Sequence, residues 1–272
     1  MPALQLAGIR QLSGGLLYIL FFLGKGKFLP KPNEWRPILI LALLNFFLSN
    51  GLSTWGVKYI SAGLGSIIGA AFPLWLVIIG LFGKQQRMPV KAIIGFILGF
   101  GGICVIFFEN LHNFLSPEFT FGIIISLAST WSWAFGTIYT KEKARSFNPY
   151  YSLGWQMFLS GIALTIITRA TGTSVALNQI PWQSWTAIAY LVLFGSVLSF
   201  IAYLYALQNL STEQTSIYAY INPVVAVLLG TLLFDEHLTV YIAVGGLVTL
   251  YGVYIINRSL KARTKATIEK VL

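Results

Sequence analysis

The chain reads SIIGAAFP at residues 66–73 and SIYAYINP at residues 216–223, two versions of one segment placed 150 residues apart. The same shift also matches tryptophan, serine and glycine positions outside the segment. These pairs are Trp35 with Trp185, Ser49 with Ser199, Ser61 with Ser211, Gly80 with Gly230, Gly95 with Gly245 and Gly102 with Gly252. Tryptophan, proline and glycine rarely recur in register by chance, so the sequence indicates an internal duplication.

The composition predicts that the duplicated chain lies in a membrane. Of its 272 residues, 56% are hydrophobic and 10% are charged, whereas soluble proteins carry about 25% charged residues. Apolar runs long enough to cross the hydrocarbon core as helices follow one another with short connections. We predict nine transmembrane helices, at residues 4–23, 37–57, 62–82, 90–108, 121–140, 150–168, 185–206, 212–233 and 239–257. The expected fold class is therefore an all-α polytopic membrane protein.

The positions of the basic residues predict the orientation. A formal net charge of +10 would ordinarily suggest a nucleic-acid partner. If the helices alternate, however, the lysines and arginines gather on one side, in the loops at 25–36, 84–91 and 141–145 and in the tail from Arg258 to Lys270. Only Lys58 and Arg169 lie in loops on the other side. This bias predicts a cytoplasmic C-terminus in a plasma or bacterial inner membrane, with the lipid bilayer and no nucleic acid as partner.

The duplication predicts two repeats of unequal length. The expected parts are a first repeat at 1–110 with four helices, a second repeat at 121–258 with five, and a basic cytoplasmic tail at 259–272. Leu12-Ser13-Gly14 matches Leu159-Ser160-Gly161 at a slightly shorter offset, so the helix at 121–140 has no counterpart after Met1. We therefore expect two five-helix repeats with the first helix missing. Because five is odd, the repeats would insert with opposite orientations, which alternating access exploits.

Short motifs follow one another in order along nearly the whole chain. They are Leu6-Ala7-Gly8-Ile9-Arg10, Ser61-Ala62-Gly63 leading to Phe72-Pro73, Trp155-Gln156-Met157, Ser211-Thr212 leading to Asn222-Pro223-Val224-Val225-Ala226, Phe234-Asp235-Glu236-His237-Leu238, and Gly245-Gly246-Leu247 through Gly252-Val253. Together they resemble the motifs of the drug/metabolite transporter superfamily, specifically the EamA-like permeases. The resemblance implies ten helices in two repeats, and movement of small metabolites, amino acids or drugs through a central cavity between the halves.

Polar side chains at helical spacing predict the substrate pathway, because polar groups in hydrocarbon are costly unless they face protein or water. Four faces have such spacing: Asn45 with Ser49; Ser126, Thr130, Trp133 and Thr137; Gln156 with Ser160; and Thr215, Tyr218 and Asn222. In the alternative interpretation, serine and threonine bond their own backbone while asparagine and glutamine join neighbouring helices. Tyr203, Trp133 and Tyr218 lie near mid-span and would wall a pocket for an amphipathic or aromatic solute, although aromatic packing between helices explains them equally well.

Proline and glycine positions suggest hinges and close packing. Pro73 and Pro223 fall mid-helix in this interpretation, where proline removes a backbone hydrogen bond and bends the helix. Because these prolines recur in both halves, a role in the cavity or in a hinge is an alternative to the simpler role of a packing kink. The pairs Gly65 with Gly69 and Gly95 with Gly99 have the spacing that lets helices approach closely. Packing within each half is the expected use, and a homodimer is the alternative.

The sequence offers no enzyme site. His112 and His237 lie in loops and Asp235 is the single aspartate, so we expect no catalytic residues, no metal and no cofactor. Of the acidic residues, Glu213 alone approaches a membrane segment, and its place in a first helical turn predicts a capping role.

Three function classes follow. The expected function is a permease or exporter of small organic solutes that works by alternating access, without a carboxylate proton relay. Facilitated transport, or coupling through another gradient, is therefore favoured. The alternatives are a non-transporting remnant or membrane partner subunit and, behind these, an intramembrane enzyme.

Overall fold

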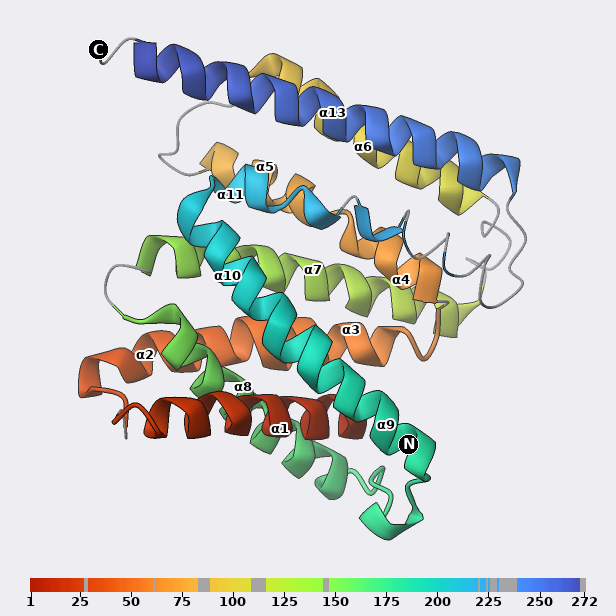
Figure 1. The fold of residues 1–272 in the computed structure, drawn as a ribbon. Coiled ribbons are helices and arrows are strands. Elements are labelled where there is room, and N and C mark those ends of the chain that lie inside the picture. The colour runs from red at the N-terminus through yellow and green to blue at the C-terminus, as the bar shows by residue number, and fades with distance from the viewer. Residues whose placement is uncertain are drawn as a thin grey trace. The chain divides into compact units, whose positions relative to one another are not determined.

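The computed structural model describes residues 1–26, 29–60, 62–82, 89–108, 116–143, 147–219, 221–223, 225, 229 and 239–269. Within these ranges the chain forms helices and turns and no strand (Figure 1), which confirms the all-α class. The helices up to the chain's middle are α1 (Ala3–Leu23), α2 (Pro32–Leu41), η1 (Ala42–Asn50), α3 (Gly51–Gly56), α4 (Ala62–Gly69), α5 (Phe72–Phe82), α6 (Val90–Phe107) and α7 (Pro117–Lys143). The later ones are α8 (Pro149–Ala170), η3 (Leu177–Gln179), α9 (Trp182–Tyr190), η4 (Leu191–Leu198), α10 (Ser199–Asn209), α11 (Thr212–Thr215) and α13 (Val240–Glu269).

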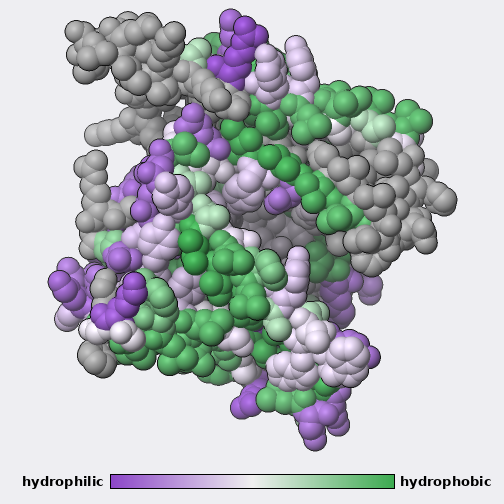
Figure 2. Space-filling view, viewed as in Figure 1, coloured by the Kyte–Doolittle hydropathy of each residue, from purple (hydrophilic) through white to green (hydrophobic). Residues whose placement is uncertain are grey.

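Five helical segments are long and apolar enough to cross a bilayer: Ala3–Leu23, Pro32–Gly56, Pro117–Lys143, Pro149–Ala170 and Trp182–Asn209. Shorter apolar helices cover Val90–Val105 and Ala243–Ile256. These seven segments coincide with predicted spans. Large apolar side chains are exposed along them, and Figure 2 shows hydrophobic residues over much of the described surface on the face in view. Such a surface suits contact with lipid rather than with water.

Contacts divide the chain into two compact units, and each unit combines segments from both halves of the sequence. The first unit comprises Met1–Lys58 and Trp131–Ser211, and the second comprises Tyr59–Thr130 and Thr212–Leu272. Each unit therefore takes one piece from each half of the sequence. The boundary within α7 falls between Thr130 and Trp131. A sequence half is thus not a unit of packing in this chain.

In the first unit, α1 packs along α8 through glycines. A Cβ on Gly15 would lie 2.7 Å from the carbonyl oxygen of Gly154, and one on Gly161 would lie 3.0 Å from that of Gly8. The pairs Gly8–Gly161 and Gly15–Gly154 run in opposite chain directions, so the helices are antiparallel. A shift of 146 residues relates Gly8 to Gly154 and Gly15 to Gly161, so it exchanges the two contacts. The helix pair therefore has an approximate two-fold axis between its members.

In the second unit, α6 packs along α13 in the same way. A Cβ on Gly102 would lie 2.5 Å from the carbonyl oxygen of Gly245, and one on Gly95 would lie 2.8 Å from that of Gly252. These two pairs exchange under a shift of 150 residues, the offset of the sequence duplication. Thr249 Oγ1 donates to the carbonyl oxygens of Gly245 and Gly99, at 2.8 and 3.3 Å. Gly95 therefore packs within the chain, but against a helix of the other half, so the expectation of packing within each half was wrong for this glycine.

Two π-helical stretches occur at matching places in the halves. They are η1, within the segment Pro32–Gly56, and η4, within the segment Trp182–Asn209. A π-helix widens the turn and disturbs the α-helical hydrogen-bond ladder, so its carbonyls are available to other donors. Side chains donate to three carbonyls in each stretch: those of Leu44, Asn45 and Phe46 in η1 and those of Phe194, Gly195 and Val197 in η4.

The region around Pro73 differs from the prediction of one continuous helix at 62–82. Helix α4 ends at Gly69, and α5 begins at Phe72, so Pro73 is the second residue of a new helix. Proline is tolerated there because the first helical amides have no intrahelical acceptor. In the second half, the chain leaves the helix at Ser216 and Ile217, and Pro223 is helical and buried. Most of the predicted span 212–233 beyond Pro223 lies outside the described residues.

Candidate functional site

An aromatic cluster in the first unit gathers side chains from three segments. It consists of Phe46 on η1, Trp133 on α7, and Phe200 and Tyr203 on α10. The Trp133 ring centroid lies 5.1 Å from that of Tyr203 and 5.8 Å from that of Phe200, while Phe46 lies 5.2 Å from Phe200. The interplanar angles of 39° and 84° at Trp133 are tilted and edge-on geometries, which aromatic pairs prefer.

The cluster has a polar tip where α7 meets α10. The hydroxyl oxygens of Thr137 and Tyr203 lie 2.6 Å apart and share a hydrogen bond. Trp133 and Thr137 are four residues apart on α7, so they occupy one helix face. Lys141, one turn further on, donates to the carbonyl oxygens of Leu207 and Leu210. A lysine on the last carbonyls of α10 stabilises the negative end of that helix.

Asn45 lies beside the cluster with one polar atom unsatisfied. Its side chain is 8% exposed, and its Oδ1 is buried without a hydrogen-bond partner among the described residues. Oδ1 sits so close to α7 that a Cβ on Gly136 would lie 1.7 Å from it. Gly136 follows Trp133 by three residues, so the amide of Asn45 and the indole of Trp133 meet the same face of α7. An unsatisfied buried acceptor is costly and marks a place where a ligand donor would be favoured.

Gln156 and Ser49 are buried in the first unit, but no described contact joins them to the cluster. Gln156 Nε2 donates to Ser152 Oγ at 3.0 Å, one turn back on α8. This bond lies within α8, whereas the sequence analysis offered Gln156 either a place in the pathway or a contact with a neighbouring helix. Ser160, on the same face of α8, has a buried hydroxyl with no hydrogen-bond partner among the described residues. Ser49 lies on η1, 7% exposed.

The other predicted pathway residues belong to the second unit. Tyr218 packs near Phe72, with ring centroids 6.2 Å apart, and remains 37% exposed. Asn222 is exposed, whereas Pro73 and Pro223 are buried. The nine predicted residues therefore divide between the units. Trp133, Tyr203 and Asn45 come together, and Tyr218 shares a region with Phe72 and Pro73.

Three polar residues of α1 belong to this region but escaped the sequence reasoning. Gln11 Nε2 donates to the carbonyl oxygen of Phe46 at 3.0 Å, and Tyr18 donates its hydroxyl to that of Val197 at 2.9 Å. Arg10 Nε donates to Ser196 Oγ at 2.9 Å. One helix thus holds both π-helical stretches. The sequence feature that could have identified them is an arginine and a glutamine inside an apolar span, because such side chains are costly in a membrane without partners.

The described residues contain no group of three histidine, cysteine, aspartate or glutamate side chains able to hold a metal ion. What the site offers is aromatic surface, one shared hydroxyl bond and one buried amide oxygen without a hydrogen-bond partner among the described residues. Together with the apolar spans, this site is typical of the class of multi-pass membrane transporters.

Comparison with known proteins identifies the family. The chain matches the EamA-like transporter family at residues 1–108 and 120–258, and it therefore belongs to that family. It is 34% identical over 246 residues to the uncharacterized inner membrane transporter YedA of Escherichia coli, covering 88% of this chain and 76% of YedA. It is 28% identical to the uncharacterized transporter YvbV of Bacillus subtilis, covering 98% of this chain and 86% of YvbV.

A solved structure shares the fold. A protein crystal structure superposes with a TM-score of 0.77 at 18% sequence identity and covers 97% of this chain and 89% of that chain. The chain is therefore a multi-pass membrane transporter of the EamA-like family, as its motifs predicted.

Proposed function

We propose that this chain moves small organic solutes, such as metabolites, amino acids or drugs, by exchanging two inverted halves between two conformations. The supporting observation is the pair of antiparallel glycine contacts, α1 with α8 and α6 with α13. In each pair, corresponding helices of the two sequence halves meet antiparallel, and the shift between the halves exchanges their two glycine contacts. If both helices span the bilayer, the approximate two-fold axis between them lies in the membrane plane, as in inverted-repeat transporters.

The aromatic cluster is the part of the proposed pathway that contacts the solute. Trp133, Phe200 and Tyr203 offer broad apolar surface, and Asn45 Oδ1 offers one acceptor for a donor on the solute. This combination favours a solute with an apolar or aromatic body and an N–H or O–H group. The proposed transport is facilitated or coupled to a gradient other than a carboxylate proton relay, because the sequence holds no acid at mid-span.

Reconstituted protein tests the proposed activity. The full chain in liposomes should exchange labelled solute in counterflow, with aromatic and aliphatic amino acids and related metabolites as the first panel. The matched control is the Trp133→Ala variant, which removes the central ring. Absence of counterflow for every solute in the panel, from protein that is folded and inserted, would count against transport by this chain.

The proposed topology has its own test. Single cysteines placed at Trp35 and Trp185 in a background lacking Cys104 should react with a membrane-impermeant maleimide from opposite sides. A cysteine after Arg258 should react from the cytoplasm, because basic residues favour that side. Labelling of Trp35 and Trp185 positions from one side would contradict the inverted arrangement.

A further inference from the structure

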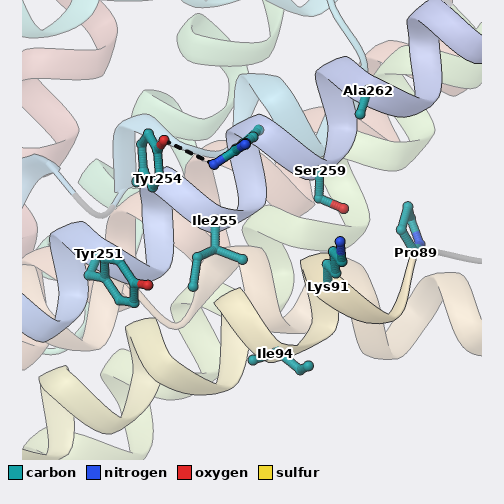
Figure 3. A pocket seen from close by; sticks show the side chains of 9 residues that line it. Pro89, Lys91, Ile94, Tyr251, Tyr254, Ile255, Ser259 and Ala262 are labelled. Atoms are coloured by element: carbon teal, nitrogen blue, oxygen red, sulfur yellow. Dashed lines mark hydrogen bonds between the residues drawn. The ribbon is translucent and has the colours of Figure 1, made fainter.

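A groove in the second unit lies at one end of the α6–α13 helix pair. Its volume is about 790 Å³, and it is lined by the start of α6 and by the stretch of α13 from Tyr251 to Ala262. Figure 3 shows the Lys91 side chain of α6 pointing toward Ser259 of α13, with Ile94 further along α6. The groove is separate from the aromatic cluster, which belongs to the first unit.

Two cations give the groove its charge. Lys91 comes from α6, and Arg258 comes from α13, where Arg258 Nη1 donates to the hydroxyl of Tyr254 at 3.4 Å. Neither cation forms an ion pair with a carboxylate within the described part of the chain. Lys91, Arg258, Ser259 and Tyr254 thus place ammonium, guanidinium and hydroxyl donors around one space. Those donors match the oxygens of a phosphate group.

The other side of the groove is apolar and exposed. Ile94 is 48% exposed, Tyr251 60% and Tyr254 57%. The apolar part of α13 ends at Ile256, so Arg258 lies just beyond it and the tyrosines just within it. Tyrosine and arginine in this order mark the boundary between hydrocarbon and headgroups. The groove therefore spans the depth at which a phospholipid passes from its acyl chains to its phosphate.

The opposite end of the same helix pair shows that the fold does not demand these charges. Under the shift of 150 residues, Lys91 corresponds to Tyr241 and Arg258 corresponds to Phe108. Those two rings pack on one another with centroids 5.6 Å apart. Of these two corresponding residue pairs, Lys91 with Arg258 is cationic and Tyr241 with Phe108 is aromatic.

We propose that this groove binds an anionic phospholipid, with its phosphate between Lys91 and Arg258 and its acyl chains along Ile94 and Tyr251. The lipid belongs to the leaflet on the side of the basic loops. The proposal is independent of which solute is transported. Basic pockets beside membrane helices bind anionic headgroups, and each cation near the surface contributes enough that removing two weakens binding roughly 30-fold.

The test uses the full chain in nanodiscs, with bound lipid counted by native mass spectrometry. Wild-type protein should retain phosphatidylglycerol in preference to phosphatidylcholine. The double variant Lys91→Gln with Arg258→Gln should lose that preference. The control double variant Lys25→Gln with Arg36→Gln removes two exposed cations from the basic side outside the groove, and it should keep the preference.

Three outcomes would overturn the proposal. They are equal retention of both lipids by the wild type, equal loss in both double variants, and displacement of the lipid by millimolar glycerol phosphate. The second would indicate diffuse surface charge, and the third a site for a soluble anion. If the groove double variant does not fold, the single variants Lys91→Gln and Arg258→Gln replace it, each with roughly fivefold weaker retention expected.

Discussion

The two glycine-lined helix pairs, α1 with α8 and α6 with α13, share a packing solution and differ in what surrounds it. In both, carbonyl oxygens face glycines of the partner helix at distances that leave no space for a Cβ. The α1–α8 pair also adjoins two π-helical stretches, to which Gln11, Arg10 and Tyr18 donate hydrogen bonds. In the α6–α13 pair, the described side-chain bond across the contact is that of Thr249 to Gly99. The shift of about 150 residues relates α1 to α8 and α6 to α13, so the two pairs are not copies of one another. They share a mode of packing, and among the described residues the α1–α8 pair has more polar side-chain contacts around it.

The largest expected effect breaks the scaffold itself. In Gly102→Ala, the new methyl group would lie 2.5 Å from the carbonyl oxygen of Gly245, so the helices must separate. We expect a loss of roughly 1–3 kcal/mol of stability, read as a lower melting temperature in detergent. The control is Gly101→Ala, the adjacent residue, where a Cβ meets nothing within 4 Å. There alanine should raise helix stability by about 0.5–1 kcal/mol. A lower melting temperature for both would contradict the contact.

The second-largest expected effect concerns the aromatic cluster rather than the glycine-lined helix pairs. Trp133→Ala removes the ring that contacts Phe200 and Tyr203, so we expect flux to fall by up to about tenfold, the worth of one or two aromatic contacts. Trp131→Ala, two residues away on α7, removes a ring that is 46% exposed. Counterflow should stay near wild type in that control. Equal losses in both variants would show that tryptophan matters here for insertion rather than for the solute.

A third, smaller effect tests how Asn45 is held. Gly136→Ala would place a methyl group on Asn45 Oδ1, but a side chain can move aside more easily than a backbone. We expect a cost of about 1 kcal/mol in thermal stability, which Asn45→Ala in the same chain relieves by restoring space. Double-mutant analysis of melting temperatures measures this coupling. Additive losses would place the two residues out of contact.

The smallest effects are expected at Gln156 and Asn222, one in each unit. Asn222→Ala or Gln156→Ala should lower flux while leaving membrane insertion intact. Gln156 bonds Ser152 on its own helix at 3.0 Å, a contact worth about 1 kcal/mol, so its effect should be a few-fold. Unchanged flux in both variants would remove them from the pathway.

Much of the fold could be predicted from the sequence, because the thickness of the bilayer sets the number of consecutive apolar residues in a membrane-spanning helix. The seven apolar segments of the described chain were found to within a few residues. The π-helical stretches were not, since Ala42–Asn50 and Leu191–Leu198 have ordinary apolar composition. Their register depends on donors from α1 and α7, which lie far away in the sequence.

The candidate site was predictable only in part. Helical spacing placed Asn45 and Trp133 on two different predicted faces, because periodicity is information local to one span. It did not predict that both would meet the same face of α7. It could not show that Gln156 turns to Ser152, or that the break before Pro73 comes at Ala70 and Ala71. Both depend on tertiary packing. The role of Arg10 was missed because charge counting treats an arginine as an indicator of orientation alone.

The π-helical stretch at Ala42–Asn50 makes this part of the chain sensitive to length more than to composition. Deleting one residue there would remove the extra residue that the wide turn accommodates and allow an ordinary α-helix, so Gly51–Gly56 would keep its face relative to α2. The carbonyl oxygens of Leu44 and Phe46 would then return to the helix ladder, and Ser132 and Gln11 would lose their acceptors. Exchange of one aliphatic residue for another would leave these two bonds intact, whereas a single-codon deletion would remove both.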